Sequence, residues 1–295
     1  MTGKVGLIGT GLMGAPMAER LLAHQPLVVY NRTPAKLAPL QQAGAELASS
    51  VAELLQCEVV ILMLSDAAAI RATVLPDSPS DSPSDSLPEA TDLSNCTLIQ
   101  MGTIGPSQSR ELLAEVTARG GEYLEAPVLG SIPEAKAGKL QVMVGATPAQ
   151  YERWLPLLSQ LGEPTLIGEV GAAAALKLAL NQLIGSLTSA FGLSLRFTQQ
   201  QGVPVEAFMQ ILRQSALYAP TFDKKLQRMV EQNYANPNFP TKHLLKDTRL
   251  FLDEAAGLET APLAGVQQIL EKACELGWAD ADYSALIAAI QPVEQ

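Results

Sequence analysis

The sequence predicts an α/β domain with a mostly parallel, doubly wound sheet, followed by an all-α domain, with a long interdomain helix joining the two. Three observations lead to this expectation. Short runs rich in Val, Ile and Leu alternate with helical stretches in the first part of the chain, as βαβ units require. A glycine-rich turn joins the first such run to the first helix. After Gly168 no clear strand pattern remains, and the helical stretches become long.

The expected strands are short and apolar throughout, which is typical of strands buried on both faces of a parallel sheet. They are residues 5–8, 27–30, 59–64, 97–101 and 141–144. Helices are expected between them, for example at residues 15–23 and 107–119. Residues 76–92 interrupt the pattern with repeated Pro, Ser and Asp. Such a segment cannot bury apolar surface, so it predicts a flexible insertion, either a tolerated loop expansion or a regulatory element.

The boundary between the two domains is expected at Gly168, which gives domains of residues 1–168 and 169–295. Helix breaks are predicted near Gly202, Pro220 and Pro237, because Gly and Pro end helices. The most apolar stretch, residues 170–197, contains Lys177, Asn181 and further polar residues. We therefore expect a buried helix there and no transmembrane span.

Composition excludes several classes of function. The net charge of −10 opposes binding to nucleic acid, which needs a basic face. The three cysteines form no CxxC pair, and two histidines without clustered partners predict no metal site. The chain begins without a secretory apolar region. We expect a cytoplasmic protein that binds no membrane.

The first turn has the pattern G-x-G-x-x-G, formed by Gly9, Thr10, Gly11, Leu12, Met13 and Gly14. It follows the first expected strand and opens the first expected helix, which is the context that dinucleotide binding requires. Gly9 permits the tight turn, Gly11 lets the backbone approach a pyrophosphate, and Gly14 permits close packing of helix on strand. The helix start then offers N–H groups to the phosphates. A Rossmann domain is therefore expected.

The end of the second strand selects the cofactor. NAD enzymes usually carry an acidic residue there, about 20 residues after the glycines, to bind the ribose 2′-hydroxyl. This chain has Asn31, Arg32 and Thr33 and no carboxylate. Arg32 can pair with a 2′-phosphate, and Asn31 and Thr33 can donate hydrogen bonds. The sequence thus favours NADP(H), although a surface arginine without a role would look the same.

Lys177 is the only charged residue between Val170 and Leu195. An ammonium on so apolar a helix is costly unless it reaches water, pairs or lines a cleft. Asn181 follows one turn later on the same helix face. Two interpretations remain open from the residues alone. The pair is either a proton donor with an orienting amide, or a lysine at a helix edge in contact with water.

Several motifs, in order along nearly the whole chain, resemble the β-hydroxyacid dehydrogenase family. The resemblance is greatest to its glyoxylate/succinic semialdehyde reductase branch, related to 3-hydroxyisobutyrate dehydrogenases. The motifs are residues 6–14 with Met17 and Ala18, residues 101–104, residues 125–128, Gly168 and Gly171 leading to Lys177 and Asn181, and residues 239–247.

The resemblance implies a role for each matching residue. Lys177 is implied as the catalytic acid/base, with Asn181 assisting. Thr103 and Lys246 are implied as cofactor contacts, and Phe239 and Asp247 as borders of the substrate site. Leu64 and Ser65 are also expected at the cofactor. The members of the family commonly dimerise, so a homodimer or a higher homo-oligomer is expected.

Two positions depart from the family pattern, which usually has Ser where Gly102 and Leu129 stand. The second serine normally helps to bind a substrate carboxylate, and Leu129 cannot do so through its side chain. The N–H groups of Gly130 and Ser131 and the Ser131 hydroxyl are expected to replace it. These departures make the substrate pocket less polar than in typical members.

The sequence thus predicts an NADPH-dependent oxidoreductase that transfers hydride between NADP(H) and a small aldehyde or oxo acid, of the glyoxylate, succinic semialdehyde or 3-hydroxy acid type. Two alternatives remain. Leu129 permits a reductase of imines or bulkier ketones, although the imine reductases of this superfamily usually lack the lysine. The losses at Gly102 and Leu129 also permit a non-catalytic NADPH-binding interaction module.

Overall fold

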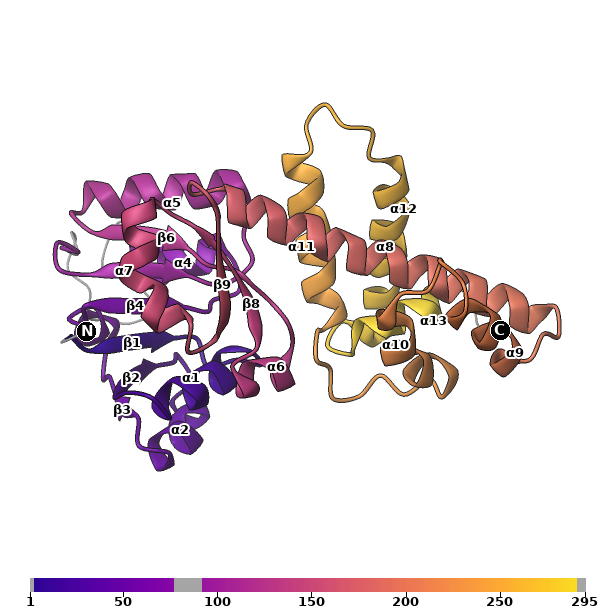
Figure 1. Ribbon diagram of the computed structural model, residues 1–295, viewed down its shortest axis with the longest axis horizontal. Helices are drawn as coiled ribbons and strands as arrows, with labels where there is room; N and C mark the ends of the chain where they lie inside the picture. The colour runs from indigo at the N-terminus through magenta and orange to yellow at the C-terminus, as the bar shows by residue number, and fades with distance from the viewer. Residues whose placement is uncertain (1–2, 77–91, 291–295) are drawn as a thin grey trace. The chain divides into compact units, whose positions relative to one another are not determined.

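The computed structural model describes residues 3–76 and 92–290. The chain forms two compact units, Met1–Lys177 and Leu178–Gln295. The first unit is built around a sheet and the second from helices (Figure 1). Nearly all of the insertion predicted at residues 76–92 lies outside the described residues.

One sheet of nine strands forms the centre of the first unit within the described residues. Its order is β3-β2-β1-β4-β5-β6-β8-β7, with β9 beside β8. Neighbours from β3 to β6 are parallel, whereas β8 is antiparallel to β6 and β7 and parallel to β9. The strands are β1 Val5–Ile8, β2 Leu27–Tyr30, β3 Glu46–Leu47, β4 Val59–Leu62, β5 Thr97–Gln100, β6 Glu122–Glu125, β7 Val128–Leu129, β8 Leu140–Gly145 and β9 Gly162–Gly168.

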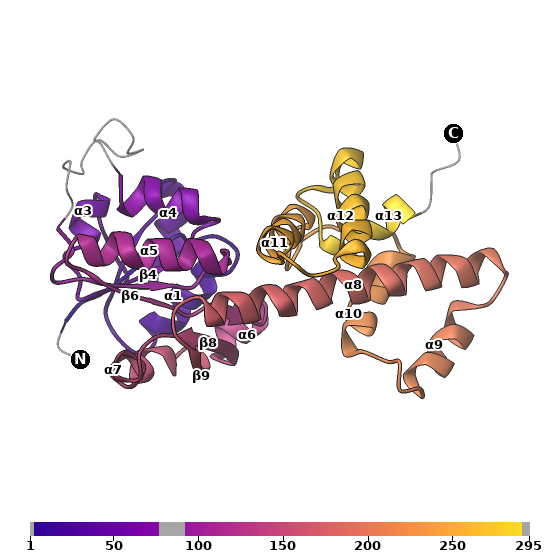
Figure 2. The same cartoon turned by 90° about the horizontal axis from the view of Figure 1, so that it is seen from above.

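Helices cover both faces of this sheet. Figure 2 shows α3, α4 and α5 on one face and α7 on the other. The helices of the first unit are α1 Gly14–Leu22, α2 Ala38–Gln42, α3 Val51–Leu54, α4 Ala67–Val74, α5 Pro106–Ala118, α6 Ile132–Ala137 and α7 Pro148–Leu158, with the short 3-10 helix η1 Pro34–Leu37.

Alternate residues of one strand enter two separate cores. In β4, Val59 and Ile61 pack in the core that contains Trp154 of α7, whereas Val60 and Leu62 pack in the core that contains Ile70 of α4. All four residues of β4 are buried. A strand flanked in this way must be apolar at every position. The predicted doubly wound sheet is therefore confirmed.

All five strands expected from the sequence are present, with differences of at most two residues at their ends. Four strands were not predicted: β3, β6, β7 and β9. Strand β6 begins and ends with glutamate, and β9 contains Pro164 and is mostly half-exposed. A proline at a sheet edge costs no ladder hydrogen bond. Edge strands and strands with partnered carboxylates do not give the apolar pattern that identified the others.

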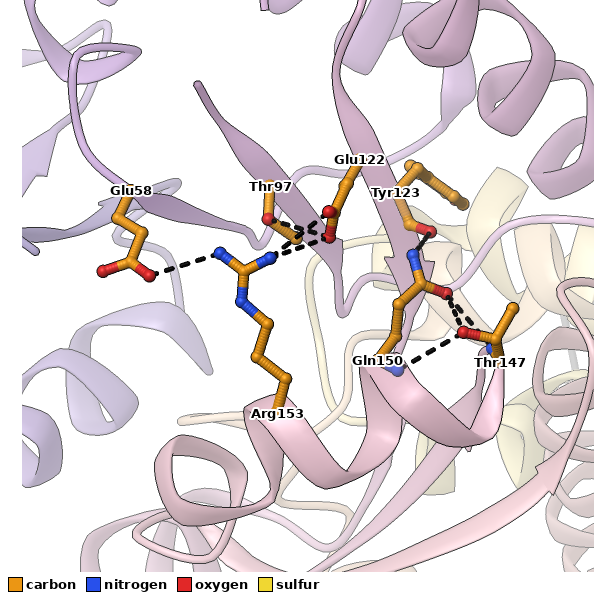
Figure 3. Close-up of polar contacts among 7 residues, drawn as sticks. All are labelled: Glu58, Thr97, Glu122, Tyr123, Thr147, Gln150 and Arg153. Carbon is orange, nitrogen blue, oxygen red and sulfur yellow. Dashed lines mark hydrogen bonds and ion pairs between the residues drawn. The ribbon is translucent and has the colours of Figure 1, made fainter. Parts of the chain in front are cut away.

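Helix α7 lies against the end of the sheet at which the parallel strands begin, and Arg153 connects it to that end (Figure 3). Its guanidinium lies 3.3 Å from Glu58, which precedes β4, and 3.2 Å from Glu122, the first residue of β6. Gln150, one turn earlier, donates to the carbonyl of Tyr123 at 3.3 Å. Arg153, Glu58 and Glu122 are partly exposed, so these ion pairs add little stability.

Helix α8 begins in the first unit and continues through the second. The helices of the second unit are α8 Ala172–Gln200, α9 Val205–Arg213, α10 Pro220–Val230, α11 Thr241–Glu254, α12 Ala261–Ala273 and α13 Leu286–Ile290, with a π-helical turn η3 Cys274–Trp278 and a 3-10 turn η4 Tyr283–Ala285. The helix breaks expected near Gly202 and Pro220 are confirmed. Residues 169–290, all described, contain no strand beyond an isolated bridge between Pro240 and Asp282.

By length and composition alone, α8 is apolar enough to cross a membrane, and 44% of its apolar window is buried inside the protein. This criterion leaves the expectation of a buried helix, and of no transmembrane span, a prediction. The criterion does not distinguish a membrane span from the long core helix of a soluble protein. In this chain Phe191 and Leu195 of α8 pack in a core with Met209 and Phe222.

A buried ion pair connects α10 to η4 in the second unit. The ammonium of Lys225 lies 2.8 Å from both carboxylate oxygens of Asp282 and 4.1 Å from the centre of the Tyr283 ring. Ser284 donates its N–H and its hydroxyl to the same carboxylate. Burial lowers the pKa of Lys225, and the Asp282 carboxylate opposes that shift. Both charges are thus compensated by close partners.

Asp282→Ala is expected to destabilise the protein by about 3–5 kcal/mol, because it leaves the buried Lys225 ammonium uncompensated. Urea unfolding followed by circular dichroism measures this change. Asp280→Ala is the matched control, since it breaks the exposed pair with Lys242 at 2.6 Å. It should cost less than about 1 kcal/mol. Equal unfolding midpoints for the two variants would contradict a structural role for the buried pair.

Candidate functional site

The glycine-rich turn follows β1 and lies at the carboxyl edge of the sheet. Gly9 has φ +95°, and a Cβ there would lie 2.3 Å from the carbonyl oxygen of Met63. A Cβ on Gly14 would lie 1.8 Å from the carbonyl oxygen of Gly9. Real Cβ atoms do not approach backbone oxygens so closely. These two glycines are thus required by the protein's own packing, as the motif predicts.

Gly11 differs from its neighbours in the turn. A Cβ on this residue would meet no atom within 4 Å. Gly11 and Leu12 are exposed, Met13 is half-buried, and no described side chain caps the helix α1 that starts at Gly14. The turn therefore presents an open backbone surface and an uncapped helix start, which together suit a phosphate group.

Asn31 fixes this turn to the end of β2. Its Oδ1 accepts from the Thr10 N–H at 3.3 Å, and its Nδ2 donates to the carbonyl of Thr33 at 3.0 Å. Thr10 is buried, and its hydroxyl has no hydrogen-bond partner among the described residues. Arg32 and Thr33 are exposed. The Asn31 amide thus organises the turn, and Arg32 is the cation placed in solvent beside it.

Gly102, after β5, lies against the segment that follows β4. A Cβ on Gly102 would lie 2.5 Å from the carbonyl oxygen of Leu64. The Gln100 amide holds Gly102 in place by accepting from its N–H at 2.8 Å and donating to its carbonyl at 3.0 Å. The absence of a serine at this position thus has a steric reason. Thr103, half-buried, and Ser65, exposed, follow the same two strands.

The segment expected to bind a substrate carboxylate contains an internal carboxylate. Ser131 donates its N–H to Glu134 at 2.8 Å and its hydroxyl to the same oxygen at 2.6 Å. This capping box starts helix α6. Leu129 is half-buried at the end of β7, and Gly130 has φ +137°. An incoming carboxylate would have to compete with Glu134 for both donors of Ser131.

Lys177 is half-buried in the first part of α8. The start of this helix is bound by Glu125, the last residue of β6, whose Oε1 accepts from the N–H groups of Gly171, Ala173 and Ala174. Sequence reasoning placed Glu125 in a motif and gave it no role. The sequence does contain a glutamate at the end of an apolar segment and a glycine before a long helix, which can form a helix cap. Because 46 residues separate Glu125 from Gly171, their pairing could not be predicted from the sequence.

In the second unit, Asn181 of α8 meets Asp247 of α11. Asn181 Nδ2 donates to Asp247 Oδ2 at 2.7 Å, and the Lys246 ammonium lies 3.1 Å from Asp247 Oδ1. Asn181 and Asp247 are 2% and 3% exposed. Because a carboxylate only accepts, the amide nitrogen must face it. Asn181 Oδ1 therefore points away from Asp247, and it has no hydrogen-bond partner among the described residues.

Two further residues lie on α11 or just before it. Phe239 is half-buried and packs edge-on against Tyr283 with ring centroids 5.8 Å apart. Burial, followed by the nearby Lys246 charge, lowers the pKa of His243. No group of three or more metal-ligating side chains occurs among the described residues.

Two protein-family profiles together match residues 4–290. The first, described as the NAD-binding domain of 6-phosphogluconate dehydrogenase, matches residues 4–171. The second, described as the NAD-binding domain of NADP-dependent 3-hydroxyisobutyrate dehydrogenase, matches residues 171–290. The two profiles meet at Gly171, the residue that Glu125 binds at the start of α8.

Individual proteins with similar sequences include enzymes and a nuclear factor. Glyoxylate/succinic semialdehyde reductase 1 of Arabidopsis thaliana is 32% identical over 98% of both chains. The cytokine-like nuclear factor N-PAC of Homo sapiens is 30% identical over 97% of this chain and 51% of its own. Among solved structures, the 3-hydroxyisobutyrate dehydrogenase of Mycobacterium tuberculosis superposes with a TM-score of 0.83, at 22% identity, over 99% of this chain and all of its own.

Alanine substitutions at Gly11 and at Gly9 should have different effects, the first on NADPH binding and the second on folding. Gly11→Ala is expected to change the melting temperature by less than about 3 °C, since its Cβ enters open space. It should weaken NADPH binding about tenfold or more, because that space is needed by the pyrophosphate. Fluorescence titration with NADPH measures the affinity. Gly9→Ala is the contrasting variant and should fold poorly. An unchanged NADPH affinity for Gly11→Ala would show that this turn does not hold the cofactor.

Proposed function

The chain belongs to the NAD(P)-dependent 3-hydroxyisobutyrate dehydrogenase family, and from that membership we propose that it reduces a small carbonyl compound with NADPH, using Lys177 as the proton donor. The described residues fit a dinucleotide. The backbone at Gly11 is open, α1 lacks a side-chain cap, and the buried Thr10 hydroxyl has no described partner. When bound, the dihydronicotinamide supplies the hydride.

The residues of this chain have separate tasks in the proposed reaction. The Lys177 ammonium donates a proton to the carbonyl oxygen as negative charge develops there. Asn181 lies one turn further along the same face of α8. Asp247 holds the Asn181 amide by its nitrogen, so its oxygen is left as an acceptor for an ammonium or a hydroxyl. The oriented, buried amide beside a lysine on an apolar helix is the observation that carries the proposal.

Arg32 supports NADP(H) over NAD(H). It is exposed at the end of β2, and residues 31–33 contain no carboxylate that would repel a 2′-phosphate or bind a 2′-hydroxyl. Asn31 is used within the turn, so Arg32 and Thr33 are the side chains left to meet the phosphate. The description of the second family profile, which names an NADP-dependent enzyme, agrees with this preference.

The substrate class that we propose is a small aldehyde or oxo acid, as the name of the Arabidopsis relative suggests. Leu129 and the bond from Ser131 to Glu134 favour the less polar members of that class, because neither side chain offers a ready donor to a carboxylate. Reduction of a neutral ketone or imine is the second candidate on the same observation. A panel with glyoxylate, succinic semialdehyde, neutral aldehydes of equal length and cyclic imines separates the two.

Lys177→Ala is expected to lower kcat about 10²–10⁴-fold, with NADPH affinity nearly unchanged, because only the proton donor is removed. Consumption of NADPH at 340 nm, beside NADH as the alternative cofactor, measures the rate. Lys224→Ala removes an exposed lysine of α10 and serves as the control. Wild-type turnover in Lys177→Ala would remove the assignment. NADPH binding without turnover of any substrate by the wild-type protein would favour a binding module, as the similarity to N-PAC permits.

We also propose that the protein is a homodimer or a higher homo-oligomer in the cytoplasm. The second-unit part of α8 exposes Leu183 (50%), Leu187 (38%), Leu193 (59%) and Phe197 (60%). Successive spacings of four, six and four residues place these side chains within an arc of about 120° on a helix of 3.6 residues per turn, as in a helix-pairing face. The three cysteines are all unpaired, which agrees with a reducing compartment.

The double variant Leu193→Glu, Phe197→Glu is expected to shift the protein towards the monomer, because two charges cannot be buried in a helix pair without partners. Light scattering after size-exclusion chromatography measures the mass. Ile211→Glu, which changes an exposed residue on α9, is the control. The same mass for all three proteins would contradict an α8 interface.

A further inference from the structure

We propose that Glu125 is a positioning residue for Lys177. Its buried carboxylate holds the first turn of α8 at the carboxyl end of β6, and thereby fixes the place from which the lysine side chain extends. This inference rests on the proposed function, in which Lys177 donates the proton. It concerns a residue within the first unit, to which Lys177 also belongs.

Glu125 acts as the N-cap that α8 lacks in its own sequence. The helix begins at Ala172, and the preceding residue, Gly171, has no side chain with which to cap it. Glu125 Oε1 accepts from the N–H groups of Gly171, Ala173 and Ala174 at 2.8, 2.9 and 3.0 Å. The negative charge also lies at the positive end of the helix dipole.

The other carboxylate oxygen of Glu125 also accepts a hydrogen bond. Ser109 of α5 donates its hydroxyl to Glu125 Oε2, and the same hydroxyl lies 2.9 Å from the Tyr123 hydroxyl. Glu125 is 1% exposed. Its burial raises the pKa of the carboxyl, while the Ser109 hydroxyl and the three backbone N–H groups oppose that shift. Four donors around one buried group leave it a single orientation.

The backbone around the Glu125 carboxylate is formed by glycines at two positions. Gly145 of β8 is its partner across the antiparallel pair, and a Cβ on Gly145 would lie 2.4 Å from Glu125 Oε1. Gly171 has φ +103°, a conformation that glycine adopts readily. Gly145 thus leaves space for the Glu125 carboxylate, and Gly171 adopts the backbone conformation in which its N–H group donates to that carboxylate.

Lys177 follows the last bonded residue, Ala174, by three positions, so a single rigid turn of helix separates them. A displacement of the first turn would therefore carry the lysine with it. Glu125 also leads directly into residues 126–131, the segment expected at the substrate. One side chain thus ties the proton donor to that segment, and a shift of about 1 Å between reacting groups can cost roughly 10²-fold in rate.

The test compares Glu125→Gln and Glu125→Ala with Thr147→Ala. Thr147 caps α7, so its loss removes a helix cap that does not lead to Lys177. We expect Glu125→Ala to lower kcat about 10²-fold and Glu125→Gln, which keeps an acceptor oxygen, about tenfold, with the NADPH dissociation constant changed less than about twofold. Thr147→Ala should lower the melting temperature and leave kcat unchanged. An unchanged kcat in both Glu125 variants overturns the proposal.

A double-variant cycle separates positioning from general damage. In a Lys177→Ala background, Glu125→Gln should cost less than about threefold further, since the group it positions is already gone. If Glu125→Gln lowers kcat as much in the Lys177→Ala background as in the wild-type protein, the inference is overturned. If Glu125→Ala does not fold, Glu125→Gln decides alone.

Hydrogen exchange gives a readout that needs no activity. The amides of Ala173 and Ala174 should exchange faster in Glu125→Ala, while those of β5 stay protected. Unchanged exchange at these amides would also overturn the inference. A wild-type protein that reduces no carbonyl compound would contradict the proposed function. The exchange rates of Ala173 and Ala174 would still show whether Glu125 caps α8.

Discussion

The hydrogen bonds that hold the start of helix α8 are the constraint on which the placement of Lys177 in the first unit depends. The first N–H groups of any helix lack partners within the helix and must find them elsewhere. Here Gly171, Ala173 and Ala174 are buried, so their N–H groups need an acceptor within the protein. Glu125 provides the acceptor from the end of a central strand. Lys177, which follows within the same unit, can then be placed by helical periodicity alone.

The two edges of the sheet have different chemistry, and the parallel arrangement is the cause. Parallel strands bring all their carboxyl ends to one edge, where the turns after β1, β2, β4, β5 and β6 meet. Those turns contain glycines, uncapped N–H groups and short polar side chains. The opposite edge contains Arg153 with its two carboxylates (Figure 3). The two ends of the parallel strands thus present different groups, open backbone N–H groups at one and paired charges at the other.

The features that the sequence predicted depend on local rules. The glycine turn, the five apolar strands and the breaks around α9 follow from periodicity and from the backbone preferences of Gly and Pro. The family, the fold class and the oxidoreductase class are confirmed by the profile matches and the relatives. The orientation of Asn181 could not be predicted in this way, because its partner Asp247 lies 66 residues away in the sequence. The bond from Ser131 to Glu134 is different, since Ser131 and Glu134 form the local S-x-x-E pattern of a capping box, which the sequence analysis did not use. The roles of the site residues remain predictions.

Gly102 determines which substitutions two neighbouring turns of the sheet can accept. Any side chain at this position would place its Cβ against the Leu64 carbonyl, so a larger residue fits only if the segment after β4 withdraws. The two turns are thus coupled through the backbone and not through side-chain chemistry. Redesign of the turn after β5 therefore has to begin with the turn after β4.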